Sequence, residues 1–316
     1  MAPRLSVIMS AYNSSGTIER AINSILNQSF TDFELIIMND GSTDDTEAKI
    51  LSFTDDRIKY HALDHAGLTK ALNFGLSRAI GEIIARHDSD DWSEPERFAT
   101  QMQRFDDDDD CALVASWHNV VDTDGNYLGQ KRIPLDDDSL KKMLRWRNPF
   151  CHGSVAFRRS ALNQTGGYNE SLLYSQDYDL WVRMGASGAK FSSVPSALYN
   201  YSISPSSIAK GWNKLGNQKR IRDNALLPAT EQEYSITAIP SLGKRKMASL
   251  WYYAVGSLAL EDGRRRRAFG SFLFSLVNDP LNWRALLRTG SVFLPRAGAV
   301  MVFGRAKNRR ESSQDE

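Results

Sequence analysis

Short apolar runs recur along the N-terminal half of the chain, separated by polar and glycine-containing stretches. Runs of this length, bounded by turn residues, predict strands that are buried in a sheet. The predicted strands are Leu5–Met9, Phe33–Met38, Arg57–Tyr60, Glu82–Arg86 and Cys111–Trp117.

Amphipathic segments lie between these runs. From about residue 17 to 28, apolar residues recur at i, i+3, i+4, i+7 and i+8, which places them on one face of a helix. A second helix is predicted from 68 to 79, with Gly81 as its C-cap, and Pro95 is expected to open a third. This alternation predicts an α/β fold with a mainly parallel sheet flanked by helices.

Polar loops follow three of the predicted strands, at Ser10–Asn13, Asn39–Ser42 and Asp88–Asp91. Parallel strands share one direction, so these loops should meet at one edge, where such sheets bind ligands. The first strand is followed by neither a G-x-G-x-x-G motif nor a phosphate loop, which argues against those two nucleotide-binding classes. A carboxylate edge must instead contact phosphate through a metal, and a base or sugar by accepting hydrogen bonds.

The acidic cluster Arg86–Asp91 carries three carboxylates in four residues at the end of a predicted buried strand. Burial of these charges is costly unless something neutralises them, and a divalent cation with oxygen ligands would do so. A solvated acidic turn that caps the helix at Pro95 is the alternative. The six residues alone do not separate the two interpretations. The acidic runs at 106–110 and 136–138 lack calcium-loop spacing and are expected to be solvated surface.

Composition is that of a soluble globular protein, with 41% hydrophobic and 24% charged residues among 316, enough for a domain and an appendage. Two cysteines make no disulfide framework and fit a reducing compartment. No signal peptide and no apolar run near the ~18 residues of a membrane span are visible. We therefore expect a cytoplasmic location.

The net charge of +1 hides an asymmetry, because Arg264 to Arg310 contains eleven basic residues and one acidic residue. Helices are predicted at 251–259, 268–277, 281–294 and 298–303, where arginines alternate with leucine and phenylalanine as in interfacial helices. We expect this basic region, 206–316, to contact the inner face of the membrane peripherally, and no nucleic-acid partner is expected. A helical subdomain that packs on the core or forms a dimer is the alternative.

Residues 4–205 contain five short motifs, at Ser6–Asn13, Asn39–Asp44, Ala85–Asp91, Gly166–Glu170 and Gln176–Trp181. Singly each motif is weak, but their order and spacing are specific. Together they resemble the family 2 glycosyltransferases of the GT-A (nucleotide-diphospho-sugar transferase-like) fold. That family transfers a sugar from a nucleotide-diphosphate donor to an acceptor, with inversion at the anomeric carbon.

The resemblance implies a nucleoside pocket lined by Ser10 and by Tyr12, which would stack on the base. Asp40 would hydrogen-bond the base, commonly uracil.

The resemblance further identifies Asp88-Ser89-Asp90 as the D-x-D motif. Asp90 would ligate Mg²⁺ or Mn²⁺ on the diphosphate, and Asp88 would lie near the ribose and the metal. Asp91 would orient the motif from behind the ligands. Arg86 would help to hold the donor.

Asp177 matches the family's usual catalytic base, with Gln176 in place of the neighbouring glutamate and Asp179 as a rival base. His152 corresponds to a histidine beside the acceptor pocket and would contact phosphate or acceptor, unless it is structural. Trp181 shares its spacing with apolar neighbours and is expected in the core. Direct displacement needs a base at the acceptor and a cation at the leaving diphosphate, on opposite sides of the sugar.

The sequence therefore predicts a metal-dependent inverting glycosyltransferase that uses a UDP-sugar and a saccharide or lipid-linked acceptor, in cell-surface polysaccharide biosynthesis. A sugar nucleotidyltransferase is one alternative, but Ser10–Gly16 lacks the glycine-rich, basic loop that such enzymes carry. A non-catalytic nucleotide-sugar-binding module is the other, and Gln176 leaves it open.

Overall fold

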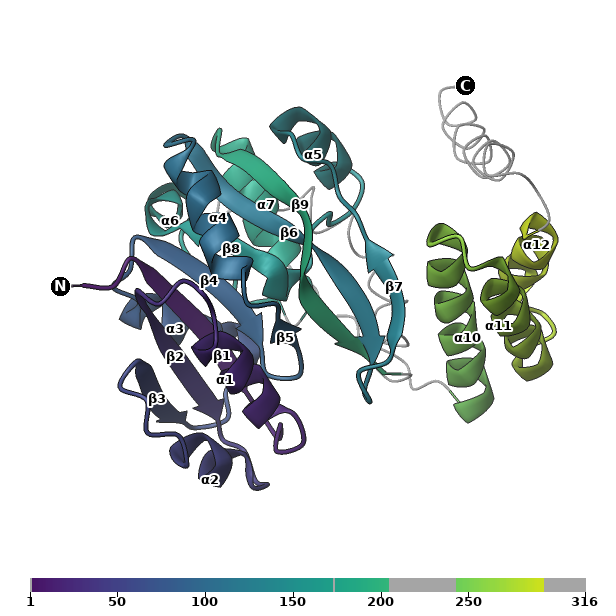
Figure 1. Ribbon diagram of the computed structural model, residues 1–316, viewed down its shortest axis with the longest axis horizontal. Helices are drawn as coiled ribbons and strands as arrows, with labels where there is room; N and C mark the ends of the chain where they lie inside the picture. The colour runs from purple at the N-terminus through teal and green to yellow at the C-terminus, as the bar shows by residue number, and fades with distance from the viewer. Residues whose placement is uncertain (1, 173, 205–242, 293–316) are drawn as a thin grey trace. The chain divides into compact units, whose positions relative to one another are not determined.

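The computed structural model describes residues 2–172, 174–204 and 243–292 (Figure 1). These residues belong to two compact units, which are described separately below. The first contains residues 2–202, and the second contains the helices between 243 and 292. The predicted boundary at 205/206 and the predicted helix at 298–303 lie outside the described residues.

One mixed sheet organises the first unit. Its N-terminal part pairs in parallel, in the order β3 (Ile58–Leu63), β2 (Phe33–Asp40), β1 (Leu5–Ala11) and β4 (Ile83–Asp88). The remaining strands extend the sheet from β4 in the order β8 (Val155–Arg158), β6 (Cys111–Asp122), β9 (Lys190–Ile203) and β5 (Trp92–Ser93), with β7 (Tyr127–Lys131) paired to β6. The pairs β4/β8, β8/β6, β9/β5 and β6/β7 are antiparallel.

Helices cover both faces of this sheet, and each face has its own apolar core. Along β1, Ile8 belongs to one core and its neighbours Val7 and Met9 to the other, so the whole strand is buried. This two-sided burial explains why the parallel strands are nearly continuous apolar runs. The helices are α1 (Ile18–Leu26), α2 (Thr46–Leu51), α3 (Leu68–Arg78), α4 (Arg97–Asp106), α5 (Asp137–Leu144), α6 (Leu162–Thr165) and α7 (Gln176–Ala186).

The predicted fold class is confirmed, with two local corrections. Gly81 does not cap α3, because the C-cap of that helix is Ala79. The Gly81 N–H instead donates to Ser6 Oγ at 2.8 Å, and a Cβ at position 81 would lie 2.6 Å from the Ser6 nitrogen. Pro95 does not open α4, which begins at Arg97. Because β5 lies between the acidic cluster and that helix, the cluster is not a cap for it.

The second unit contains α10 (Lys244–Glu261), α11 (Arg265–Asn278) and α12 (Trp283–Ser291). A small apolar core around Ala259, Ala268 and Phe272 joins these helices. Within it, the Asn282 side chain donates to the hydroxyls of Ser249 and Ser275 at 3.1 Å each. None of the helices in the described residues is long and apolar enough to cross a membrane.

Candidate active site

Three loops meet at the carboxyl ends of the parallel strands. Ser10 lies beside Asp88 in the register of β1 and β4, so the polar loops start at the same level. The Ser14 and Ser89 hydroxyls are 2.8 Å apart, and Asn13 Oδ1 accepts from the Thr43 N–H at 2.8 Å. These bonds join the loop after β1 to the loops after β4 and β2, so the predicted convergence is confirmed.

Asp88 is held by the buried guanidinium of Arg86. Arg86 Nη2 donates to Asp88 Oδ1 at 2.6 Å, and the Arg86 side chain is fully buried while the Asp88 side chain is partly open. Nε and Nη1 of Arg86 have no hydrogen-bond partner within the described structure. Both nitrogens are closed to solvent, so the described contact of this guanidinium with a site carboxylate is the one to Asp88.

Asp91 lies behind the motif, fully buried. Its carboxylate accepts from the Tyr199 hydroxyl and from the Ser202 N–H, both at 2.7 Å. The same Tyr199 oxygen accepts from the Asp88 N–H at 3.1 Å, so one phenol links the two acidic residues. Burial raises the pKa of the Asp91 carboxyl well above its usual range, and the charges of Asp90 and Asp88 raise it further.

Asp90 lies at the solvent edge of the cluster. Desolvation raises the pKa of its carboxyl to about 6 despite the residue's exposed outer side, and the charge of Asp88 adds to the shift. Arg20 Nη2 donates to the Asp90 carbonyl at 3.2 Å, and the charges of Arg86 and Arg20 oppose the rise in the Asp90 pKa. The net shift is still upward, so these cations offset the burial and the charge of Asp88 only in part.

This donor set fits a Mg²⁺ or Mn²⁺ ion that also binds phosphate. Such ions use hard oxygen ligands, and Mg²⁺ typically takes one or two carboxylates together with substrate phosphates and water. Asp88 and Asp90 could supply the two carboxylates, and a cation there would offset the effect of the Asp88 charge on Asp90. No group of three or more His, Cys, Asp or Glu in the described ranges could hold a metal without such a substrate.

Asp40 is almost completely buried at the end of β2. Its carboxylate accepts from the N–H groups of Ala66 and Gly67 at 2.8 and 3.0 Å, which fixes the turn before α3. Tyr12 is 46% exposed and stacks on the His65 ring, with the centroids 4.2 Å apart, whereas Ser10 is buried. Residues 65–67 therefore lie against both side chains that were predicted to bind the base.

Asp177 lies in the first turn of α7, half-buried. Asn148 Nδ2 donates to its Oδ2 at 2.6 Å. The rival base Asp179 is fully buried and accepts from Arg183 at 2.7 and 2.9 Å, which binds it into the structure of the helix. Gln176 is buried as well. The geometry therefore favours Asp177 over Asp179 as the more accessible carboxylate.

Tyr168 lies between the acidic edge and α7. Burial raises the pKa of its hydroxyl, the negative charges of Asp177 and Asp88 raise it further, and Arg86 opposes them. The charges of Asp177 and Asp88 thus both act on this hydroxyl. His152 Nε2 lies 2.9 Å from that oxygen, and its ring packs edge-on against Trp181, which is buried as predicted.

Sequence reasoning missed Tyr199, Asn148 and the fully buried Arg97. Arg97 donates to the Arg86 carbonyl at 2.9 Å and to the Val155 carbonyl at 3.3 Å, so it fixes β4 just before the motif. Burial lowers the pKa of its guanidinium to about 10. These residues come from distant segments and belong to no short motif, so only the folded chain shows their role.

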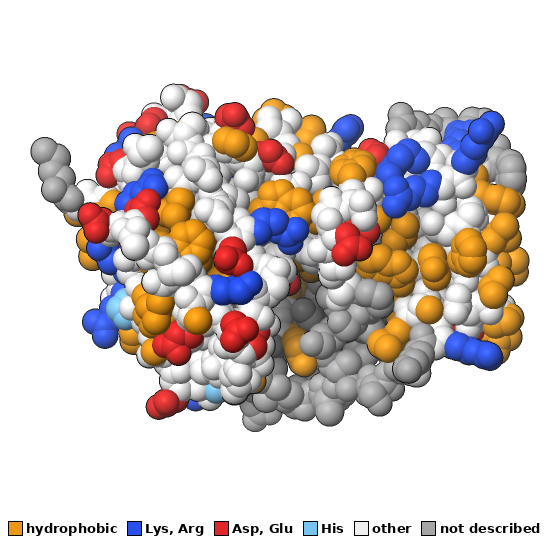
Figure 2. Space-filling model, turned by 60° about the horizontal axis from the view of Figure 1, so that its bottom comes forward, with side chains coloured by type: hydrophobic (Ala, Val, Ile, Leu, Met, Phe, Trp, Pro, Cys, Tyr) orange, Lys and Arg blue, Asp and Glu red, His pale blue; other side chains and the backbone are white. Residues whose placement is uncertain are grey.

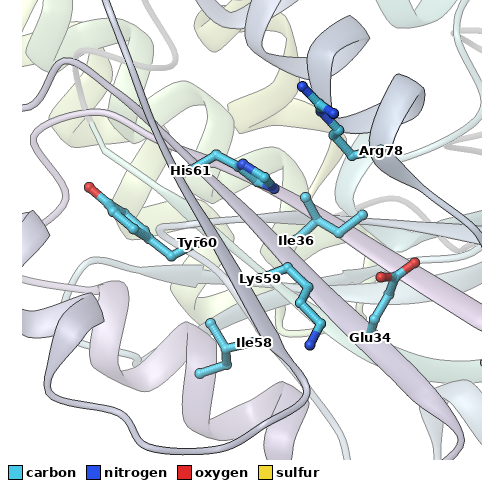
Figure 3. Close-up of a pocket in the computed structure, with 7 residues that line it drawn as sticks. All are labelled: Glu34, Ile36, Ile58, Lys59, Tyr60, His61 and Arg78. Atoms are coloured by element: carbon cyan, nitrogen blue, oxygen red, sulfur yellow. The ribbon is translucent and has the colours of Figure 1, made fainter.

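A separate cavity of about 380 Å³ lies along the first half of β2 and β3 (Figure 3). Its lining contains none of the predicted site residues. Ile36, Lys59 and His61 share the face of the sheet that Arg78 of α3 covers, as their register requires. The cavity is away from the carboxyl ends of the strands and plays no part in the chemistry described above.

Comparison with known proteins places this arrangement in a family. The model of glycosyl transferase family 2 matches residues 6–166. The chain is 30% identical over 211 residues to the O-antigen biosynthesis glycosyltransferase WbnJ of Escherichia coli, covering 65% of this chain and 82% of the relative. It is 29% identical over 212 residues to the E. coli UDP-Gal:alpha-D-GlcNAc-diphosphoundecaprenol beta-1,3-galactosyltransferase, covering 64% and 75%.

A solved structure shares the fold. The mannosyltransferase PcManGT from Pyrobaculum calidifontis, in complex with GDP-Man and Mn²⁺, superposes with a TM-score of 0.56 at 18% identity, over 97% of this chain and 80% of that one. The family match spans half of the chain, and it includes the loops that meet at the acidic edge. The chain belongs to glycosyl transferase family 2 and is a glycosyltransferase.

Proposed function

We propose that this glycosyltransferase transfers a sugar from a nucleotide-diphosphate donor, with UDP as the nucleotide, to a saccharide or lipid-linked acceptor in polysaccharide biosynthesis. The observation that carries the proposal is the acidic pair Asp88 and Asp90, with Asp88 held by the buried guanidinium of Arg86. These carboxylates lie at the edge where this fold binds ligands, and they could hold a cation there.

The donor assignment follows from this edge. Asp88 and Asp90 would hold Mg²⁺ or Mn²⁺ against the diphosphate. Arg86, whose guanidinium is fully buried, would help to hold the donor by fixing the Asp88 carboxylate. Ser10, Tyr12 and Asp40 lie at the ends of β1 and β2, where they would form the nucleoside pocket. PcManGT carries Mn²⁺ with its sugar nucleotide, and the galactosyltransferase relative is named for UDP-Gal.

Asp177 would act as the general base of an inverting displacement. Its carboxylate takes the proton of the acceptor hydroxyl while that oxygen bonds to the anomeric carbon and the bond to the diphosphate breaks. The bound cation would stabilise the negative charge on the departing diphosphate. Asn148 orients Asp177 through the 2.6 Å bond, and His152 with Tyr168 would border the acceptor or its phosphate.

The acceptor class is supported by the relatives. WbnJ is named for O-antigen biosynthesis, and the galactosyltransferase is named for a diphosphoundecaprenol acceptor, which is a lipid. A lipid-linked acceptor would be met at the cytoplasmic side of a membrane. We therefore extend the proposal to a cytoplasmic enzyme in peripheral contact with that surface.

Donor binding tests the proposal directly. UDP-sugars and GDP-sugars are titrated by calorimetry with Mn²⁺ and with a chelator, and slow donor hydrolysis is followed. We expect Mn²⁺-dependent binding of a UDP-sugar that Asp90→Ala abolishes. Asp109→Ala is the matched control, because Asp109 is a fully exposed carboxylate of the surface run. Metal-independent binding, or equal binding by Asp90→Ala, would contradict the proposal.

A further inference from the structure

The second unit exposes apolar side chains that its own core does not use. Val277 is 78% exposed, Leu281 is 88% exposed and Trp283 is 60% exposed. Leu273, Phe274, Leu286 and Leu287 are exposed in the same unit. Isolated exposed apolar residues are ordinary, but seven in two helices and the link between them mark a surface that contacts something else.

Helix α12 is apolar on two opposite sides. Ala285 is buried, as is Val292 just beyond the helix, and their seven-residue spacing places them on one side, toward the unit's core. Trp283, Leu286 and Leu287, at i, i+3 and i+4, form the other side, and all three are exposed. The side of α12 with Ala285 is used in folding, whereas the apolar side with Trp283, Leu286 and Leu287 remains exposed to solvent.

Helix α11 continues the same pattern. Arg266, Leu273 and Val277, at i, i+7 and i+11, lie on one exposed stripe. The opposite side, with Ala268 and Phe272, is buried in the core of the unit. We call the exposed apolar residues of α11, of α12 and of the short link between them (Leu273, Phe274, Val277, Leu281, Trp283, Leu286 and Leu287) the apolar face.

Positive charge accompanies the apolar face. Residues 243–292 contain nine basic and three acidic residues. Arg265, Arg266 and Arg267 are exposed at the start of α11, and the Arg284 guanidinium lies over the Trp283 ring, 5.4 Å from its centre. Figure 2 shows hydrophobic side chains gathered over the part that carries α10–α12, with Lys and Arg at its edges.

We infer that the apolar face inserts into the surface of a bilayer that contains anionic lipid. Leucine and tryptophan side chains would enter the boundary between headgroups and acyl chains, and the arginines would pair with lipid phosphates. Tryptophan beside arginine suits that boundary, since each has an apolar body and a polar end. This inference deepens the proposed function, on which it rests for the lipid-linked acceptor.

An apolar face without basic residues around it would indicate a soluble protein partner. A second copy of the chain would bring the same arginines against one another, which costs free energy at a two-fold interface. An anionic bilayer satisfies both the apolar and the basic side chains at once. Charge complementarity therefore selects the lipid surface as the occupant.

Vesicle flotation of the full chain tests the inference. The double variant Trp283→Gln/Leu286→Gln is compared with Trp146→Gln/Leu51→Gln, whose residues are exposed to a similar extent (60% and 61% against 60% and 57%) but lie in the first unit. Vesicles of phosphatidylcholine with phosphatidylglycerol are compared with vesicles of phosphatidylcholine alone. Calorimetric donor binding in solution is measured for every variant.

We expect the wild-type chain and the Trp146/Leu51 variant to float with anionic vesicles only. The Trp283/Leu286 variant should bind them at least ~10-fold more weakly, with donor binding unchanged. Arg266→Gln/Arg267→Gln should weaken binding by about fivefold for each charge and reduce its salt dependence.

Three results would overturn the inference. They are no flotation of the wild-type chain, an equal loss in both double variants, and a dimer in light scattering that Trp283→Gln/Leu286→Gln converts to a monomer without any change in flotation. Donor binding reports separately on the proposed function, so failure of one proposal does not mask failure of the other.

Discussion

The two units treat their side chains in opposite ways. In the first, charged groups such as Asp40, Arg86 and Asp91 are buried at the end of the sheet and held by named partners. In the second, apolar groups such as Leu281 and Trp283 are left in water. Buried charge costs folding free energy unless it is paired, whereas an exposed apolar side chain gains none of the free energy that burial would give.

In our two proposals, each unit depends on something outside the chain. The acidic edge is preorganised, and a bound cation would offset its negative charge. The proposed complement of the apolar face is a bilayer surface rather than a small molecule. Substitutions in the first unit should therefore impair catalysis, and substitutions in the second should impair membrane binding.

Asp177→Asn should have the largest effect. Loss of the general base should lower kcat by about 10²- to 10⁴-fold while leaving donor affinity unchanged, since Asp177 does not belong to the donor edge. Steady-state transfer and calorimetric donor binding measure the two quantities. Asp138→Asn, an exposed acid in the first turn of α5, is the control and should change neither. Normal turnover by Asp177→Asn would remove it as the base.

Tyr199→Phe should weaken the support of the acidic edge. Its hydroxyl donates to Asp91 and accepts from the Asp88 N–H, so its removal should lower the free energy of unfolding by about 1–3 kcal/mol and also weaken Mn²⁺-dependent donor binding. Tyr178→Phe is a matched control, because that buried hydroxyl donates to the Leu144 carbonyl instead. It should lose similar stability in urea unfolding but bind the donor normally. Equal donor binding by both variants would mean that Tyr199 does not position the motif.

The sequence predicted the fold through the apolar runs, because strands buried on both faces are nearly continuous apolar segments. Convergence of the three polar loops also followed from strand direction alone. The antiparallel half was harder to predict, since β6 and β9 are long strands that mix polar and apolar residues. Their pairing depends on contacts between distant segments, which local periodicity does not contain.

The sequence predicted those residues of the candidate site that belong to motifs, but not the residues that support them. Asp88, Asp90 and Asp177 belong to recognisable motifs, and the charges of Asp88 and Asp177 both raise the pKa of Tyr168. The residues that hold Asp88 and Asp177 belong to no motif. Tyr199 accepts from the Asp88 N–H across 111 positions of sequence, and Asn148 donates to the Asp177 carboxylate across 29. No spacing rule connects such pairs, because the distance in space is set by the packing of the whole sheet.

Acid should act on the first unit through its buried histidines. All five histidines of the chain precede residue 153. Burial, with the nearby charge of Lys131 on β7, lowers the pKa of His118 from 6.5 to about 3, while the Tyr201 ring packs edge-on against it. The unfolded chain therefore binds a proton that the folded chain does not, and stability falls as the pH drops from about 6.5 toward 3.

His118→Gln should relieve part of that loss. Between pH 7 and pH 5 the wild-type chain should lose about 1–2 kcal/mol more unfolding free energy than the variant. Urea unfolding at the two pH values measures the difference. The same loss in both proteins would show that His118 is protonated as readily in the folded state as in the unfolded state.

Leu281→Ser should have the smallest effect on folding, and this is what makes it informative. The Leu281 side chain is 88% exposed, so its loss should change the free energy of unfolding by less than about 0.5 kcal/mol. Phe272→Ala, in the core of the same unit, should cost about 3–5 kcal/mol. Urea unfolding of the full chain, followed by helical circular dichroism, compares the two. A large loss in Leu281→Ser would mean that this leucine is needed for folding. If stability is kept and flotation with anionic vesicles is weakened, the leucine stabilises contact with the lipid surface and contributes nothing to the fold.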